Sequence, residues 1–86
     1  MYRVELSKHA EKFLRSQPMH IKTAIAKKLL VLAENPDASH LDTKKMQGVD
    51  DVFRLRVGKI RVLYRRYDSQ LLILVFEIGY RGDVYK

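Results

Sequence analysis

The chain has 86 residues, enough for one domain over positions 1–86, and its 47% of hydrophobic residues suffice for a small core. It has no Cys, which excludes disulfides and thiolate metal sites, and no apolar run has the length of a signal peptide core or a membrane span. We therefore expect a cytoplasmic protein. Its net charge of +7 attracts polyanions, so the expected partner is nucleic acid or an acidic protein segment and not a membrane.

The first part of the chain predicts one strand and two helices. Residues 2–6 alternate between apolar and polar side chains, which predicts a short strand at or near a sheet edge. Ser7 is a typical helix N-cap, and Pro18 suits the first turn of a second helix. Along this second helix the apolar residues recur at the spacing of a buried stripe: Ile21, Ile25, Leu29 and Leu32. The helix should end at Asn35, because the residue before a proline avoids helical geometry.

The second part predicts a polar connector over 37–48, followed by three strands. The strands are expected at 52–57, 60–67 and 71–79, and the last is apolar on both faces, as in a central strand. A two-residue connection before it would place Phe76 opposite Arg61, and a three-residue connection would place Glu77 there. The predicted fold is α+β with the order β-α-α-β-β-β: two N-terminal helices packed on one face of a four-stranded, mostly antiparallel sheet.

The hairpin formed by the first two of these strands carries a cluster of arginines. Gly58 and Lys59 form a two-residue turn with glycine first, as a type II′ turn requires, and this turn sets Arg56 opposite Arg61. Cross-strand partners share a face, so four arginines should project together, away from the helices: Arg54, Arg56, Arg61 and Arg65. Because like charges this close repel, the pattern predicts an anion site, and phosphate suits the planar fork of arginine best. The alternative is a solvated outer face.

Three motifs resemble those of the RelE/ParE superfamily of toxin–antitoxin toxins, on the RelE side. They are Lys45-Met46-Gln47-Gly48, the hairpin from Phe53 to Tyr64, and the ending from Ile78 to Tyr85. The resemblance covers nearly the whole chain and implies a RelE-like toxin of a type II system. Such a toxin is an mRNA interferase, a ribosome-dependent endoribonuclease that cleaves A-site codons and inhibits translation, without a metal or cofactor. The implied partners are the ribosome, mRNA and a RelB-like antitoxin that wraps the toxin in a hetero-oligomeric complex.

The resemblance also implies roles for individual residues. Arg61 would stabilise the transition-state phosphate, Arg81 would assist the leaving group, and Tyr85 would stack on a base or orient the substrate. Arg56 stands where some members have a lysine proposed as general base; arginine stays protonated near neutral pH, so Arg56 is a better electrostatic clamp than a base. RNA or phosphate contacts are expected from a second group: Arg54, Lys44, Lys45, Arg65 and Tyr80.

Two alternatives remain open. One is a ParE-like toxin that inhibits DNA gyrase without catalysis. The other is a catalytically decayed homologue that only binds RNA, since Arg56 replaces the lysine and Tyr80 replaces a histidine of some relatives. The three histidines, His9, His20 and His40, share no spacing, and we expect them on the surface, neither catalytic nor metal-binding.

Overall fold

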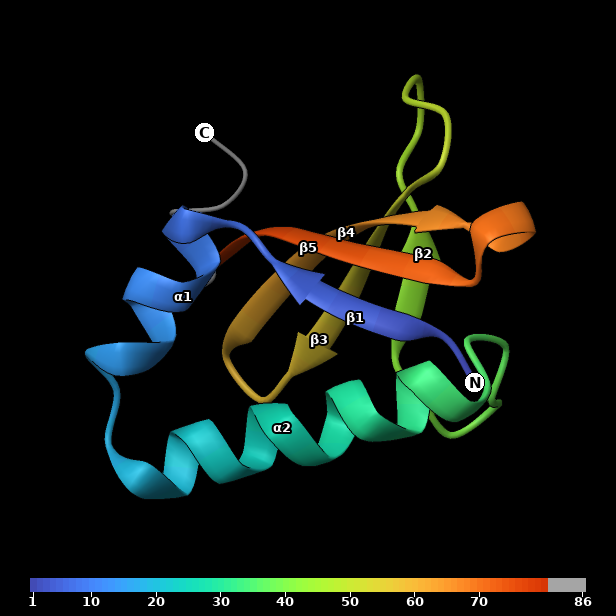
Figure 1. Ribbon diagram of the computed structural model, residues 1–86. Coiled ribbons are helices and arrows are strands. Elements are labelled where there is room, and N and C mark those ends of the chain that lie inside the picture. The colour runs from blue at the N-terminus through green and yellow to red at the C-terminus, as the bar shows by residue number, and fades with distance from the viewer. Residues whose placement is uncertain (81–86) are drawn as a thin grey trace.

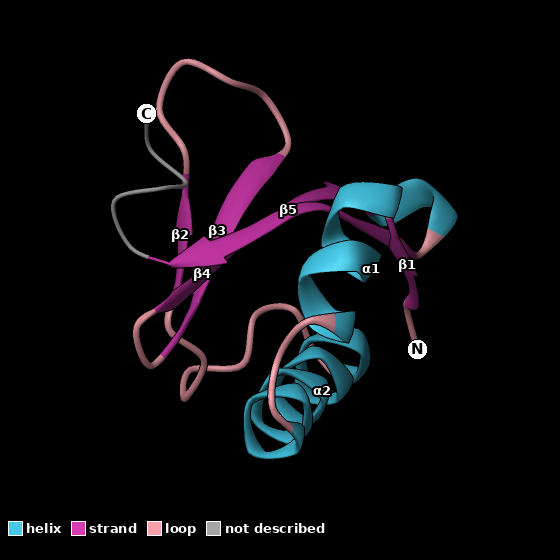
Figure 2. Ribbon diagram, turned by 90° about the vertical axis from the view of Figure 1, so that its left-hand side faces the viewer, coloured by secondary structure: helices cyan, strands magenta, loops and turns pink. Residues whose placement is uncertain are grey.

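The computed structural model describes residues 1–80, which form two helices and one five-stranded mixed sheet (Figure 1). In chain order the elements are β1 (Arg3–Leu6), α1 (Lys8–Arg15), α2 (Met19–Glu34), β2 (Thr43–Lys45), β3 (Val52–Val57), β4 (Ile60–Tyr67) and β5 (Leu72–Tyr80). The strand order is β1-β5-β4-β3-β2, with β1 parallel to β5 and the other neighbours antiparallel. Figure 2 shows both helices on the same side of the sheet. The predicted α+β class is confirmed.

The sheet has one strand more than predicted. Strand β2 lies within the segment predicted to be a polar connector and pairs antiparallel with the outer edge of β3. Its three residues, Thr43 to Lys45, are polar and show no alternation of apolar side chains. The unpaired edge of β3 therefore determines this strand, because backbone groups along it need hydrogen-bond partners whatever the side chains. The expectation that the first strand lies at an edge is confirmed by β1.

The helix ends follow the local sequence. Ser7 caps α1 by accepting a hydrogen bond from the Ala10 N–H at 3.1 Å, and its hydroxyl also donates to the Phe76 carbonyl of β5 at 2.9 Å. Pro18 occupies the N-cap of α2, and Asn35 ends this helix with its N–H donating to the Val31 carbonyl at 2.9 Å. The predicted start of α1 and the predicted start and end of α2 are thus confirmed to within a residue.

One hydrophobic core fills the space between the helices and the inner face of the sheet. The buried stripe of α2 meets the alternate residues of the hairpin in a cluster that includes Ile25, Leu29, Leu32, Leu55, Ile60, Val62 and Tyr64. The Tyr64 ring is fully buried and stacks on Phe53 with 5.6 Å between ring centroids. The opposite face of the sheet, from which the predicted arginines project, is left open by the helices (Figure 2).

The pairing of β4 with β5 differs from both predicted registers. Gly79 lies opposite Arg61, and not Phe76 or Glu77. The connection is longer than predicted, and a β-bulge interrupts the pairing at Phe76. The extra residue reverses which side chains of β5 face the core beyond this point. Ile78 is therefore buried in the position that Glu77 would otherwise occupy. Burial of an isoleucine instead of a carboxylate favours this register.

Candidate functional site

The arginine face of the sheet is built on the β3–β4 hairpin. Strand pairing sets Val57 opposite Ile60 and Arg56 opposite Arg61, which confirms the predicted register. Gly58 has a φ of +59° whereas Lys59 keeps a negative φ, the combination expected for a type II′ turn. Because Val57 and Ile60 pack toward α2, the residues that alternate with them project from the opposite side of the sheet. We call this side the arginine face; it carries Arg54, Arg56, Arg61 and Arg65.

A carboxylate that the sequence analysis missed lies within this face. Asp42 immediately precedes β2, and its backbone carbonyl accepts a hydrogen bond from the Arg56 N–H at 2.9 Å. Its side chain accepts a hydrogen bond from Arg54 Nη2 at 3.0 Å on one oxygen and from Arg56 Nε at 2.7 Å on the other. The hydrogen bond from Arg56 and the charges of Arg54 and Arg61 lower the pKa of Asp42, so it is ionised at neutral pH. The repulsion predicted among the arginines is thus partly offset by an anion of the chain itself.

The arginines differ in how far solvent reaches them. Arg61 is 6% exposed and the Arg54 side chain 11%, whereas the Arg56 side chain is 42% exposed. Arg65 lies four residues from Arg61 along β4, about 13 Å at the rise of a strand. It donates to the Asp50 carbonyl at 3.5 Å, and its guanidinium lies 5.9 Å from the centroid of the Phe76 ring. The predicted group of four therefore divides into three arginines near Asp42 and a separate Arg65.

The other predicted contact residues do not all lie on this face. Lys44 is exposed and pairs with Arg54, so it lies on the arginine face. Lys45 pairs with Phe53, whose side chain packs toward the core, and so follows the opposite side of the sheet. Tyr80 likewise pairs with Ile60. Of Lys44, Lys45 and Tyr80, the structure therefore brings only Lys44 together with the arginines.

Tyr80 packs against α1 and the segment that follows it. Its hydroxyl donates to Gln17 Oε1 at 2.8 Å, and its ring meets Phe13 edge-on, with 5.7 Å between ring centroids. The bulge at Phe76 explains this placement, because without the extra residue Tyr80 would project from the same face as Arg61. The remaining two candidates, Arg81 and Tyr85, lie outside the described residues.

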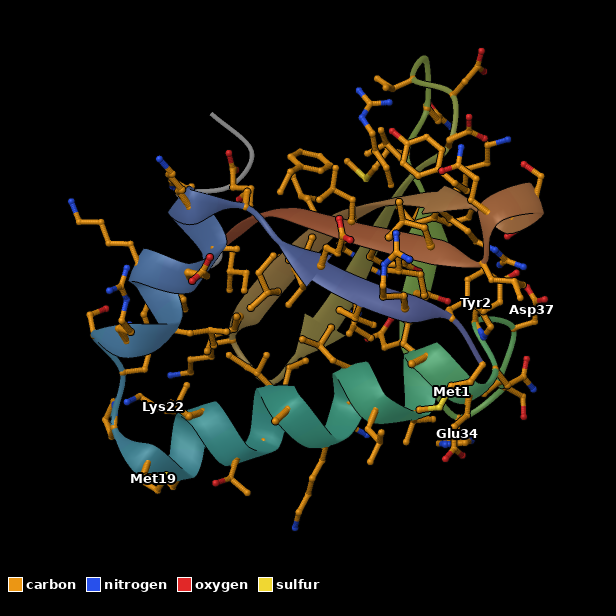
Figure 3. All side chains as sticks on the ribbon, viewed as in Figure 1. Met1, Tyr2, Met19, Lys22, Glu34 and Asp37 are labelled. Carbon is orange, nitrogen blue, oxygen red and sulfur yellow. The ribbon has the colours of Figure 1, made fainter. Side chains whose placement is uncertain are left out.

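Arg66 belongs to the other side of the sheet and forms a separate ionic cluster. It donates two hydrogen bonds to Asp37, at 2.8 and 3.0 Å, and one to Asp68 at 2.6 Å. The Tyr2 hydroxyl also donates to Asp68 at 2.8 Å, and Figure 3 shows Tyr2 and Asp37 together at this end of the molecule. Arg66 therefore pairs with two surface carboxylates and takes no part in the arginine face. We therefore assign this cluster to the attachment of the chain after α2 to the sheet.

The described residues offer few other chemical groups. The three histidines are exposed, as predicted. Within residues 1–80 no group of three or more His, Asp or Glu side chains is arranged to hold a metal ion. No helix in this part of the chain is both long and apolar enough to cross a membrane. The arginine face, together with Asp42, is the strongest concentration of interacting charges outside the Arg66 cluster within residues 1–80.

Comparison with known proteins connects this fold with toxins. Residues 4–85 match the family model for the ParE toxin of the type II toxin–antitoxin system parDE. A protein of Escherichia coli described as a RelE-like toxin is 33% identical over 98% of this chain and 90% of its own length. A protein of Methanocaldococcus jannaschii described as toxin RelE1 is 30% identical over 99% of this chain and 96% of its own length.

Solved structures show the same fold. The archaeal RelE–RelB complex from Pyrococcus horikoshii contains a chain that superposes with a TM-score of 0.82 at 27% identity, over 94% of this chain and 96% of that one. The isolated E. coli RelE toxin superposes with a TM-score of 0.79 at 22% identity, over 99% and 92% of the two chains.

Proposed function

Because the chain belongs to the ParE toxin family of type II toxin–antitoxin systems, within the RelE/ParE superfamily, we propose that it is a RelE-like endoribonuclease that cleaves mRNA on the ribosome. The observation that carries this proposal is the convergence of Arg54, Arg56 and Arg61 around one anionic group on the open face of the sheet. Guanidinium groups at this spacing suit a phosphate, whose oxygens accept several hydrogen bonds at once.

The proposed reaction needs charge stabilisation more than any special nucleophile. The 2′-OH of the RNA attacks the adjacent phosphorus, the bond to the 5′ oxygen breaks, and the proton lost from the 2′-OH is balanced by one gained at the leaving 5′ oxygen. Arg61, held by its burial in a nearly fixed position, would stabilise the charge that develops on the phosphate. The more exposed Arg56 would grip the incoming phosphate. By resemblance, Arg81 and Tyr85 would assist the leaving group and orient the base.

The proton acceptor is not assigned to a residue of the arginine face. Arg56 remains protonated, and the pKa of Asp42 is lowered by its arginine partners, which makes its carboxylate a weak base. We therefore propose that the chain contributes positioning and charge, while ribosomal RNA or water accepts the proton. The natural partner would be a RelB-like antitoxin, as in the archaeal RelE–RelB complex.

The match to the ParE model favours one other function, inhibition of DNA gyrase without catalysis. Such an inhibitor has no need of a phosphate clamp, so substitutions in the arginine face separate the two functions. An enzyme would lose cleavage by about 10²–10³-fold when a transition-state charge is removed. A gyrase inhibitor would retain its effect on supercoiling.

The test is primer extension on mRNA in a reconstituted translation reaction. The wild-type protein, Arg61→Ala and a ribosome-free control are compared, with Arg15→Ala as a matched loss of one positive charge on α1, away from the arginine face. Cleavage within the A-site codon that requires ribosomes and Arg61, but not Arg15, supports the proposal. Intact mRNA with all proteins rejects it, and a gyrase supercoiling assay then tests the alternative. Circular dichroism of each variant verifies that it is folded.

A further inference from the structure

Asp42 is held on the arginine face by its main chain, and its side chain is the part that contacts the arginines. The Asp42 carbonyl accepts the Arg56 N–H at 2.9 Å, which continues the β2–β3 pairing by one residue. The register therefore fixes the position of the residue opposite Arg56, whichever way its side chain turns. The carboxylate then uses both oxygens on two different guanidinium groups, at 2.7 and 3.0 Å.

This arrangement resembles the contacts that a phosphate would make. Two oxygens separated by one central atom, each accepting from a different arginine, are features that a carboxylate and a phosphate share. The Asp42 side chain is 47% exposed, so rotation about its own side-chain bonds would carry the carboxylate into solvent without breaking the backbone hydrogen bond. An incoming phosphate could then use the same donors.

We propose that Asp42 is a competing anion built into the site: its carboxylate occupies Arg54 and Arg56 until an RNA phosphate displaces it, and so limits the affinity for RNA. This inference rests on the proposed function, because it takes RNA as the ligand of the arginine face. The competition has a structural advantage for the free protein, since Arg54 and Arg56 are neutralised in part when no RNA is bound.

Two other roles for Asp42 give different results on neutralisation. A general base would lose cleavage when the carboxylate becomes an amide, while RNA binding stayed the same. A purely structural carboxylate would change the stability of the fold and leave RNA affinity unchanged. A competing anion predicts a gain in affinity instead, because the substitution frees two donors on the binding face.

The experiment measures binding of a short fluorescein-labelled single-stranded RNA by fluorescence anisotropy, without ribosomes. Asp42→Asn is compared with the wild-type protein and with Glu34→Gln, which makes the same change of net charge at the end of α2, on the helix side of the sheet. Asp42→Asn should bind RNA about fivefold more tightly, the value of one exposed ion pair, and Glu34→Gln should remain close to the wild type. The slope of log K against log salt should steepen by about 0.7, as expected for one further phosphate contact to a single strand.

The outcomes separate this inference from the proposed function. A gain in affinity and salt slope confined to Asp42→Asn supports competition, whether or not the wild-type protein cleaves mRNA in the translation reaction. Equal affinities for the wild-type protein and Asp42→Asn, including failure of both to bind, overturn it. An equal gain with Glu34→Gln also overturns it, because net charge alone would then explain the effect. Thermal unfolding of each variant identifies any loss of fold, and Asp42→Ala provides a second neutral variant if Asp42→Asn is unstable.

Discussion

Gly58 allows a test of the hairpin turn that sets Arg56 opposite Arg61. Its φ of +59° lies in the left-handed region, and a Cβ added there would meet no heavy atom within 4 Å. Replacement by alanine therefore introduces backbone strain without a steric clash. The cost of that backbone conformation in an L-residue is about 1–2 kcal/mol, so Gly58→Ala should lower the free energy of unfolding by this amount.

Urea unfolding followed by circular dichroism measures the change, and the midpoint of thermal unfolding should fall by about 4–8 °C for each kcal/mol in a domain of this size. Lys59→Ala is the matched control, because Lys59 has a negative φ and alanine adopts it without strain. Gly58→Asn should be less destabilising than Gly58→Ala, since asparagine tolerates positive φ better. Stability of Gly58→Ala equal to that of Lys59→Ala would refute the assignment of a strained turn.

Three further predictions concern pH. Burial raises the pKa of Tyr64 to about 12, so the unfolded chain loses this proton first as the pH rises above its ordinary value of about 10. Between about pH 8 and about pH 11 the wild-type protein should therefore lose about 1.4 kcal/mol more stability than Tyr64→Phe, measured by urea unfolding of both proteins; an unchanged difference contradicts this. Hydrogen bonds from Arg66 lower the pKa values of Asp37 and Asp68. The two ionised carboxylates therefore stabilise the fold above about pH 4, and this stabilisation is lost on acidification. Arg66→Met should lose less stability than the wild type between about pH 5 and pH 2, measured by thermal unfolding. If cleavage occurs as proposed, its rate should be flat from about pH 6 to pH 9, because the arginines stay charged across this range, and a steep titration near pH 7 would contradict the mechanism.

The sequence was sufficient for features that depend on neighbouring residues. The β3–β4 hairpin was predicted with its correct register because Gly58 determines the turn, and the turn determines which residues face each other. The cap at Ser7 and the end of α2 at Asn35 follow from local hydrogen bonding and from the restriction imposed by a proline. The core of the molecule followed from the spacing of apolar residues along α2 and the hairpin.

What the sequence did not reveal depends on contacts between distant segments. Strand β2 has no hydrophobic pattern of its own, and the unpaired edge of β3 determines where it forms. Asp42 is one of several acidic residues in polar segments, and only the pairing of β2 with β3 brings it to arginines 12 and 14 positions further along the chain. The bulge at Phe76 reversed the side of Tyr80, because a strand can absorb one extra residue wherever the core gains from it.

The position of β5 affects when the sheet can be completed during synthesis. This strand lies between β1 and β4 and pairs with both, so segments as distant as Arg3 and Leu72 must meet. Pairings of such long sequence separation form late and slowly in folding. During synthesis the two helices and the β3–β4 hairpin therefore become available before β5. This strand is the one that connects β4 with β1 in the sheet. The sheet that supports the arginine face is therefore complete only after β5 has left the ribosome.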